Sequence, residues 1–367
     1  MHADCLTYLA RRGGLSFAAA PFCEVDALIL SILAYADFDA VVPPEDDGLP
    51  LSQALARLMQ RDGWDRVGLL MSPKTPVLVR AAGESHRFGP LRLCACRSRT
   101  DDETQFASMT FRLPDGTLFL AYRGTDDTIV GWRECFELSY AAAVPAQVEA
   151  AAYLRDVAAR WPGKLRLGGH SKGGNLAVWA AVHAPAAVRQ RIVHVYSNDG
   201  PGFSQDLTRT RAYRALRISI FVPQSSPVGP LLCQDSRYQV IRSRELGGVA
   251  QHDPFSWEVR GSGFRTLSRR SLLGRRSDRV LHSWIASLDP DERAEFTDAL
   301  FSLLSADHAE TLTDLSASWL DSALAAVRAY QALPDDRRRQ LRGPIARLLV
   351  SFATGGRPNH HRKEPHA

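Results

Sequence analysis

The sequence has few cysteines, with 6 in 367 residues, and their spacing provides no disulfide framework. Cys94 and Cys96 have neither the spacing of zinc ligands nor that of a thioredoxin motif. Long uncharged apolar runs are also missing, because the run over residues 27–36 is too short to cross a bilayer. We therefore expect reduced thiols, no metal, no cofactor and no stable insertion into a membrane.

Lysine is scarce as well: the chain has 4 lysines against 41 arginines and a formal net charge of +5. The arginines lie apart from any aromatic platform, and no nucleic-acid-binding motif is present, so we expect no nucleic-acid partner. The arginine-bearing segment 261–279 has no large apolar face, which argues against a helix lying on a membrane surface. Composition leaves the oligomeric state open.

The N-terminal segment resembles an export signal only in part. Arg11-Arg12, an apolar region and Ala34-Tyr35-Ala36 imitate a signal peptide with its cleavage site, but Glu24 and Asp26 interrupt the apolar region. We therefore expect a cytoplasmic protein, with export through an atypical N-terminal signal as the alternative.

The chain alternates helical and extended patterns. Helices are expected over 22–35 (amphipathic), 51–59 and 144–160, with strands over 77–79, 91–96, 164–167, 192–196, 216–222 and 238–241 and a hairpin over 106–113 and 117–122. Strands separated by helices indicate an α/β fold with a mostly parallel central sheet flanked by helices. Ligands of such sheets bind where the strands end.

Composition and pattern suggest the following division of the chain. A helical segment over 1–60 packs on a core domain over 61–260, and a Gly-, Ser- and Arg-rich linker follows over 261–279. A helical C-terminal region is expected over 280–352, and a disordered polar tail over 353–367.

The stretch 168–177 carries the most specific motif of the chain. Its G-x-S-x-G pattern, made by Gly169, Ser171 and Gly173, follows a short strand and opens an alanine-rich helix. In this context the serine occupies a strained turn at the start of a helix, and the glycines avoid collisions with it. Ser171 is therefore the candidate nucleophile, and the N–H of Lys172 is a candidate donor to an oxyanion.

A second candidate donor follows the apolar strand at 118–122. There the loop 123–127 leaves the end of a buried strand upstream of the serine, where α/β hydrolases supply their second oxyanion donor. Thr125 could provide both its N–H and its hydroxyl. The alternative is an ordinary turn that happens to contain glycine and threonine.

A serine nucleophile needs a base and an acid, which in this architecture follow it in the order acid, then histidine. His252 is the candidate base, because it lies in a glycine-led loop after the last expected strand, unlike the other histidines downstream of the serine: His183, His194, His282 and His308. Asp199, 28 residues beyond Ser171 (199 − 171), is the candidate acid, with a simple turn residue as the alternative.

The position of the acid leaves alternatives open. The more usual position, at the end of the next strand, holds Gln224-Ser225-Ser226 and no carboxylate. Asp235 and Asp253 are reserves, although Asp253 adjoins His252 in sequence.

These motifs resemble a known family. Tyr-Arg-Gly-Thr-Asp (122–126) resembles the oxyanion loop of class 3 (fungal-type) lipases, and Gly-His-Ser-Lys-Gly-Gly-Asn-Leu-Ala (169–177) resembles their elbow, with Lys172 where leucine is usual. Together with Asn-Asp-Gly-Pro-Gly-Phe (198–203), Ser-x-Val-Gly-x-Leu-Leu (226–232) and Gln-His-Asp-Pro-Phe-Ser-Trp (251–257), the elbow resembles the Mbeg1-like proteins, a family of unknown function among the α/β hydrolases. The resemblance implies an α/β-hydrolase fold and a lipase- or esterase-like activity.

Two functional hypotheses follow. The first is a serine hydrolase that cleaves a carboxylic ester or thioester of a small acyl or lipid-like substrate. The charge of Lys172 would then favour an anionic substrate, unless this lysine merely reaches the surface. The second hypothesis is a catalytically weak or inactive α/β-hydrolase-fold module that binds a ligand or a protein.

Overall fold

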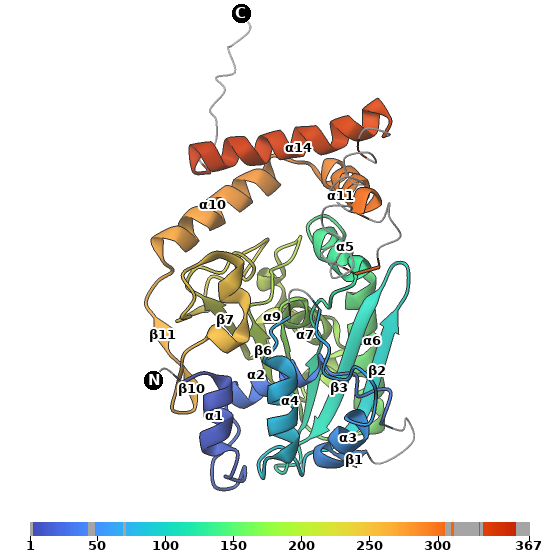
Figure 1. Ribbon diagram of the computed structural model, residues 1–367, viewed down its shortest axis with the longest axis vertical. Helices are drawn as coiled ribbons and strands as arrows, with labels where there is room; N and C mark the ends of the chain where they lie inside the picture. The colour runs from blue at the N-terminus through green and yellow to red at the C-terminus, as the bar shows by residue number, and fades with distance from the viewer. Residues whose placement is uncertain are drawn as a thin grey trace, which may run out of the picture.

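A single large sheet organises the protein. The computed structural model describes residues 3–42, 48–68, 71–304, 310–311, 330 and 333–356. The sheet has nine strands in the order β1-β2-β3-β4-β5-β6-β7-β8-β11 (Figure 1). Its strands are β1 (Leu49–Pro50), β2 (Arg92–Thr100), β3 (Gln105–Arg112), β4 (Leu118–Tyr122), β5 (Leu165–His170), β6 (Ile192–Asn198), β7 (Ile218–Pro223), β8 (Gln239–Ile241) and β11 (Thr266–Leu267). A separate small ribbon pairs β9 (Val259–Arg260) with β10 (Gly263–Phe264).

The centre of the sheet is parallel, as expected from the alternation of strands and helices. Strands β4 to β8 run parallel to their neighbours, whereas β1 to β4 on one side and β8 with β11 on the other pair antiparallel. Because the carboxyl ends of β4 to β8 share one edge, the loops that follow them converge there. The β3–β4 hairpin and the buried character of β4 are confirmed.

Helices cover both faces of this sheet. They are α1 (Cys5–Arg12), α2 (Glu24–Leu33), α3 (Leu51–Leu58), α4 (Thr75–Glu84), α5 (Ile129–Glu137), α6 (Pro145–Arg160), α7 (Lys172–His183), α8 (Ala186–Arg189), α9 (Arg211–Arg214), α10 (Leu272–Ala286), α11 (Pro290–Leu304) and α14 (Asp335–Thr354). Alternate residues of β4 enter different cores: Phe119 packs with residues of α1 to α4, and Leu120 packs with residues of α6 and α7. This alternation produces three layers, an α/β-hydrolase fold with helices on both sides.

The short strand expected over 77–79 is wrong, because these residues lie within α4. Pro76 occupies the first turn of that helix, where its missing N–H costs nothing. Leu78, Val79 and Ala82 are buried at helical spacing. A β-branched run therefore forms a helix here because its buried positions repeat with the helical period and not with the period of a strand.

The first expected helix, over 22–35, forms as α2 but is not amphipathic. Every residue from Val25 to Leu33 is buried, because α2 packs between the sheet and the helices α1 and α4. A helix that is buried all round is part of the core. The expected N-terminal segment thus supplies central packing to the α/β layers.

The segment 261–279 differs from the expected linker. It contains β10, β11 and the first half of α10, and β11 pairs with β8 to extend the sheet. The glycines and serines that suggested a linker serve as turn and capping residues, as when the Ser271 hydroxyl accepts the N–H of Gly274 at the start of α10.

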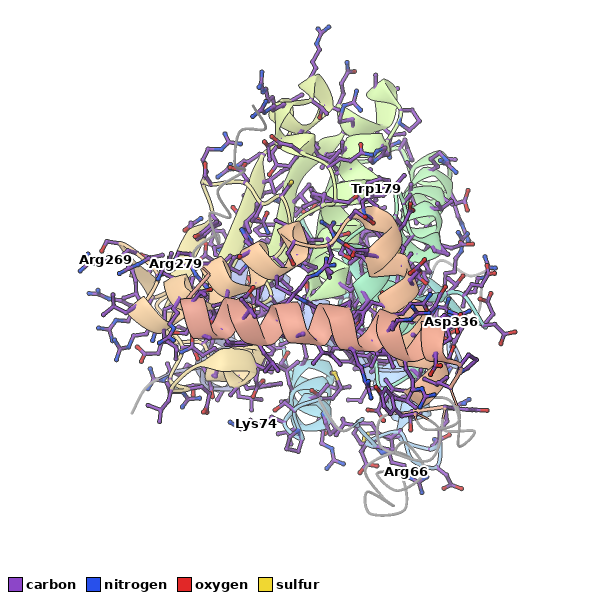
Figure 2. The ribbon with its side chains drawn as sticks, turned by 90° about the horizontal axis from the view of Figure 1, so that it is seen from above. Arg66, Lys74, Trp179, Arg269, Arg279 and Asp336 are labelled. Carbon is purple, nitrogen blue, oxygen red and sulfur yellow. The ribbon has the colours of Figure 1, made fainter. Side chains whose placement is uncertain are left out.

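The C-terminal region is helical where it is described. Helix α14 lies across α10 and α11 above the hydrolase layers (Figure 1), and Figure 2 shows it running between Asp336 at one end and Arg279 beside the other. The end of the expected tail, residues 357–367, lies outside the described residues. No helix in the described part of the chain is both long and apolar enough to cross a membrane.

Candidate active site

Ser171 lies at the sharp turn between β5 and α7. Its backbone has φ 58° and ψ −133°, a positive φ that is strained for any residue with a side chain. The Ser171 N–H donates to the carbonyl of Asn198 at 3.0 Å, and the Ser171 carbonyl accepts the N–H of Gly174 at 2.9 Å. These bonds fasten the turn on both sides, so its strain is offset by the neighbouring strand and helix.

The glycines at 169 and 173 are required by close approach, as expected. A Cβ on Gly169 would lie 2.2 Å from the carbonyl carbon of Gly173, and one on Gly173 would lie 2.1 Å from the carbonyl oxygen of Tyr122. Both contacts are backbone atoms that cannot move aside. The end of β4 therefore lies directly against the start of α7.

The loop 123–127 lies beside the serine. A Cβ on Gly124 would lie 3.1 Å from the Cβ of Ser171, so the two segments are neighbours. The hydroxyl of Thr125 contacts Sγ of Cys135 at 2.7 Å. The N–H groups of Thr125 and Lys172 are hydrogen-bonded to no group of the described residues, so both remain candidate donors to an oxyanion at Ser171.

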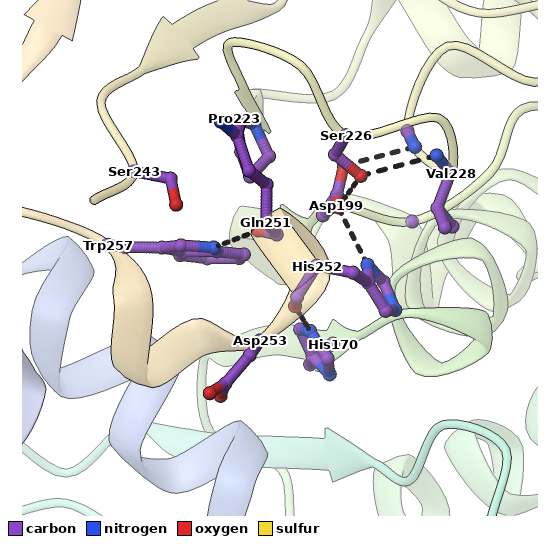
Figure 3. Close-up of polar contacts among 12 residues, drawn as sticks. His170, Asp199, Pro223, Ser226, Val228, Ser243, Gln251, His252, Asp253 and Trp257 are labelled. Carbon is purple, nitrogen blue, oxygen red and sulfur yellow. Dashed lines mark hydrogen bonds and ion pairs between the residues drawn. The ribbon is translucent and has the colours of Figure 1, made fainter. Parts of the chain in front are cut away.

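His252 and Asp199 are brought together although 53 residues separate them in sequence. Nδ1 of His252 lies 2.7 Å from Oδ2 of Asp199, as Figure 3 shows. The Asp199 side chain is fully buried, whereas that of His252 is 18% exposed. Asp199 comes from the end of β6, and His252 from the short 3-10 turn at Gly248–His252.

Two further groups hold the Asp199 carboxylate. Oδ2 accepts the hydroxyl of Ser226 at 2.5 Å, and Oδ1 accepts the N–H of Gly229 at 3.0 Å. Asp199 itself has a φ of 52°, which aims its side chain at this position. The end of β7, where the sequence lacks a carboxylate, thus provides a hydroxyl that supports the carboxylate from β6.

His170, the residue before the serine, is a part of the site that the sequence interpretation missed. Its Nε2 lies 2.9 Å from the carbonyl oxygen of His252, its Nδ1 lies 3.1 Å from the hydroxyl of Tyr35, and its ring stacks on that of His252. Burial, and after it the neighbouring His252, hold the pKa of His170 well below its usual value. The sequence did contain one signal for this role, because His170 lies inside the elbow motif directly before Ser171.

The other histidines and the reserve acids lie in different surroundings. His183 stacks on Trp179 near the end of α7. His194 is hydrogen-bonded to the hydroxyl of Ser219, and His282 to the carbonyl of Pro230. His308 lies outside the described residues. Asp235 binds Tyr213 and Arg237. Asp253 accepts the N–H of Phe255, and Figure 3 shows its carboxylate pointing away from Asp199.

Lys172 does not offer its charge to the pocket. Its side chain is fully buried, and Nζ donates to Oε2 of Glu134 at 2.7 Å and to the carbonyl of Gln105 at 2.8 Å. Glu134 also accepts the backbone N–H groups of Gln105 and Ala146, so it connects β3, α6 and α7. The expected preference for an anionic substrate therefore loses its basis, and the alternative of a lysine reaching the surface is wrong as well.

A pocket of about 390 Å³ opens beside Ser171 and His252. Its apolar wall is formed by Ile32, Met71, Pro73, Val249, Ala250, Pro254 and Phe255. Three carboxylates line it as well, those of Asp126, Asp127 and Asp253. Such a mainly apolar cavity with a few polar groups is typical of a small-molecule site. Within the described ranges, no cluster of three or more potential ligands could hold a metal ion.

Comparisons with known proteins matched a family model and several solved structures. The family model described as Mbeg1-like matches residues 82–302, and no match was found among curated proteins. Similar solved structures include a mutant form of MDLA from Penicillium cyclopium (14% identity, 65% of this chain and 83% of that chain, TM-score 0.39). Another is the Rhizomucor miehei lipase–propeptide complex, with 13% identity over 60% of this chain and 68% of that chain and a TM-score of 0.35. A third is M37 lipase, with 13% identity over 56% of this chain and 69% of that chain and a TM-score of 0.35.

Proposed function

The chain belongs to the Mbeg1-like family, and from that premise we propose that it is a serine hydrolase acting on a neutral carboxylic ester or thioester. The single observation that carries the proposal is the 2.7 Å hydrogen bond between His252 and Asp199 beside the strained Ser171 turn. Because Asp199 occupies Nδ1, Nε2 is the ring nitrogen of His252 left to take a proton from the serine.

The proposed first half-reaction forms an acyl-enzyme. Oγ of Ser171 attacks the carbonyl carbon of the ester while Nε2 of His252 takes its proton. The N–H groups of Thr125 and Lys172 donate to the tetrahedral oxyanion, and the start of α7 adds a favourable dipole. His252 then gives its proton to the leaving alcohol or thiol as the bond to it breaks.

The second half-reaction returns the enzyme to its starting state. His252 removes a proton from water, whose oxygen attacks the acyl carbon, and Oγ of Ser171 leaves and regains its proton from the imidazolium. Asp199 stays ionised throughout and stabilises the imidazolium. The three bonds that Asp199 accepts support this role, since they hold the carboxylate in place beside the imidazole.

The composition of the pocket supports a neutral acyl group. The apolar wall can bury hydrocarbon, which favours binding by about 25 cal/mol for each Å² removed from water. The Lys172 charge is paired with Glu134, and the charged side chains on the lining are aspartates, of which Asp126 is itself paired with Arg123. An acyl group that carries its own carboxylate would therefore meet no lysine or arginine on the lining.

The test is covalent labelling with a fluorophosphonate probe, read by mass spectrometry of the intact chain and its peptides. Wild type should be modified at Ser171, Ser171→Ala should not, and His252→Ala and Asp199→Asn should react far more slowly. Removing the charge of the orienting acid in a serine protease lowers turnover by about 10⁴-fold. A folded wild-type protein that fails to react would overturn the proposal in favour of a ligand- or protein-binding module.

A further inference from the structure

A second cavity, of about 490 Å³, lies at the opposite ends of the strands from Ser171. Arg166, on its lining, is the second residue of β5, whereas Ser171 follows the last. The two residues are therefore separated by about 16 Å of extended chain. This cavity is distinct from the pocket at the elbow, because the two share no lining residue.

Polar side chains from neighbouring strands form the floor of the cavity. Arg166 pairs in register with His194, and Tyr196 pairs with Ser219. Paired residues project from the same face of a sheet, so these four side chains make one continuous polar surface. Gln239, at the start of β8, lies beyond Ser219 on the same lining.

Two arginines lie on this surface, and they differ in their partners. Arg217 is exposed, and although its backbone carbonyl accepts the N–H of Val195 at 2.9 Å, its guanidinium forms no hydrogen bond or ion pair with any described residue. Arg166 is bonded at 3.2 Å to Asp115, outside the cavity lining. The only carboxylate on the lining belongs to Glu24, which accepts the N–H of Phe264 at 2.7 Å. Arg217 thus carries the guanidinium without a partner, whereas Arg166 shares its charge with Asp115.

The His194 side chain lies near both arginines. Its ring stacks on Tyr196 with 4.2 Å between centroids, and its Nε2 lies 2.8 Å from the hydroxyl of Ser219. Burial first, and then the charges of Arg217 and Arg166, lower the pKa of His194 to about 4. Both arginines therefore lie close enough to the His194 ring to disfavour its protonation.

We propose that this cavity binds a small tetrahedral oxyanion of the phosphate class, free or esterified, between Arg166 and Arg217. A guanidinium offers several N–H groups in a planar fork that matches two phosphate oxygens, and Arg217 has this fork unused. The Ser219 hydroxyl and the Gln239 amide supply further donors from β7 and β8. An anion in this position would pair directly with Arg217 and add to the contact that Arg166 makes with Asp115.

The first experiment is a phosphate titration of the full chain at about pH 7.5, where phosphate carries most of its second charge. Binding is followed through the NMR signals of the His194 ring, with ionic strength held constant by chloride. We expect saturable binding with a Kd on the order of 1 mM. Arg217→Gln should weaken it by at least about tenfold, whereas Arg214→Gln, the same change at an exposed arginine outside the cavity, should not.

Glycerol 1-phosphate is a second ligand in this experiment: binding as tight as that of phosphate indicates an esterified ligand, and weaker binding indicates the free ion. A third measurement uses sulfate, a dianion throughout the titration of His194. Bound sulfate should raise the His194 pKa above about 4, because it offsets the two arginines.

No saturable change at His194, or equal weakening by Arg217→Gln and Arg214→Gln, would overturn the proposal. Ser171→Ala should bind phosphate like wild type, so this result is independent of the hydrolase activity.

Discussion

The imidazole rings of His170 and His252 are stacked with centroids 4.5 Å apart, and Nε2 of His170 lies 2.9 Å from the carbonyl oxygen of His252. A carbonyl only accepts hydrogen bonds, so Nε2 of His170 carries the proton and its Nδ1 accepts the hydroxyl of Tyr35. Its lowered pKa keeps His170 neutral. His170 therefore positions the His252 loop without adding a charge beside the base.

This arrangement predicts a positioning role for His170. His170→Leu removes the donor to the His252 loop, and we expect fluorophosphonate labelling of Ser171 to slow by about tenfold or more, as for the loss of one buried hydrogen bond. His170→Gln, whose amide can replace the Nε2 donor, should recover much of the rate. Labelling of His170→Leu at the wild-type rate would show that the loop needs neither the hydrogen bond nor the ring stacking of His170.

Ser226 is predicted to support the acid. Ser226→Ala removes a short hydrogen bond to the fully buried Asp199 carboxylate, and a bond to a charged group contributes about 1.5–3 kcal/mol. We expect slower labelling of Ser171 and a lower free energy of unfolding in urea. Ser225→Ala is the matched control, because the Ser225 hydroxyl bonds Ser271 instead. Equal effects of the two changes would contradict the prediction.

The buried pair of Lys172 and Glu134 is predicted to be a stability element. Glu134→Gln leaves the lysine charge buried and uncompensated, which should cost about 3–5 kcal/mol of unfolding free energy. Arg133→Gln, which breaks two partly exposed pairs, one with Glu137 in the same helix and one with Asp298, should cost less than about 1 kcal/mol for each pair. Urea unfolding measures both, and a cost of Glu134→Gln as small as that of Arg133→Gln would argue that water reaches Lys172.

Substrate charge provides a further prediction for the elbow pocket. An ester of a neutral acyl group should be hydrolysed faster than the ester of a dicarboxylic acid of the same length, because aspartates and no lysine or arginine line the pocket, even though Asp126 is paired with Arg123. Screening reduces such repulsion, so the difference in kcat/KM should shrink as salt rises above about 0.1 M. A preference for the anionic ester would mean that Lys172 releases Glu134 when substrate binds.

The parts of the site that could be predicted are those set by local chain geometry or by chain order. The glycines at 169 and 173 follow from the turn itself, whose backbone contacts leave no space for a Cβ. Asp199 and His252 follow from the ends of successive parallel strands, which bring loops distant in sequence to one edge of the sheet. Both inferences need only the pattern of the chain.

The parts that could not be predicted depend on pairing across the fold. The charge of Lys172 is cancelled by Glu134, 38 residues earlier, in the helix α5 that the sequence pattern did not reveal. The run 77–79 has the composition of a strand, and its burial against α2 and α3 decides for a helix. The β-propensity of a short segment therefore predicts its structure poorly where tertiary packing favours another conformation.

Acid sensitivity follows from His194 and His170, whose pKa values are both lowered in the folded state. In the unfolded chain a histidine titrates near 6.5. Below that pH the unfolded chain binds more protons than the folded one, so stability is fully present above about pH 6.5 and falls as the pH decreases. For His194 the loss continues until the folded pKa of about 4.

The corresponding prediction concerns the slope of stability against pH. Each of the two histidines should contribute about 1.4 kcal/mol per pH unit below pH 6.5. His194→Gln should therefore reduce the slope of unfolding free energy against pH between about pH 4.5 and 6. The reduction should correspond to the uptake of nearly one proton on unfolding, measured by urea unfolding at several pH values. His183→Gln, at an exposed histidine, is the control. An unchanged slope in His194→Gln would mean that His194 takes up its proton equally in both states, and the two arginines beside it would then be screened by solvent.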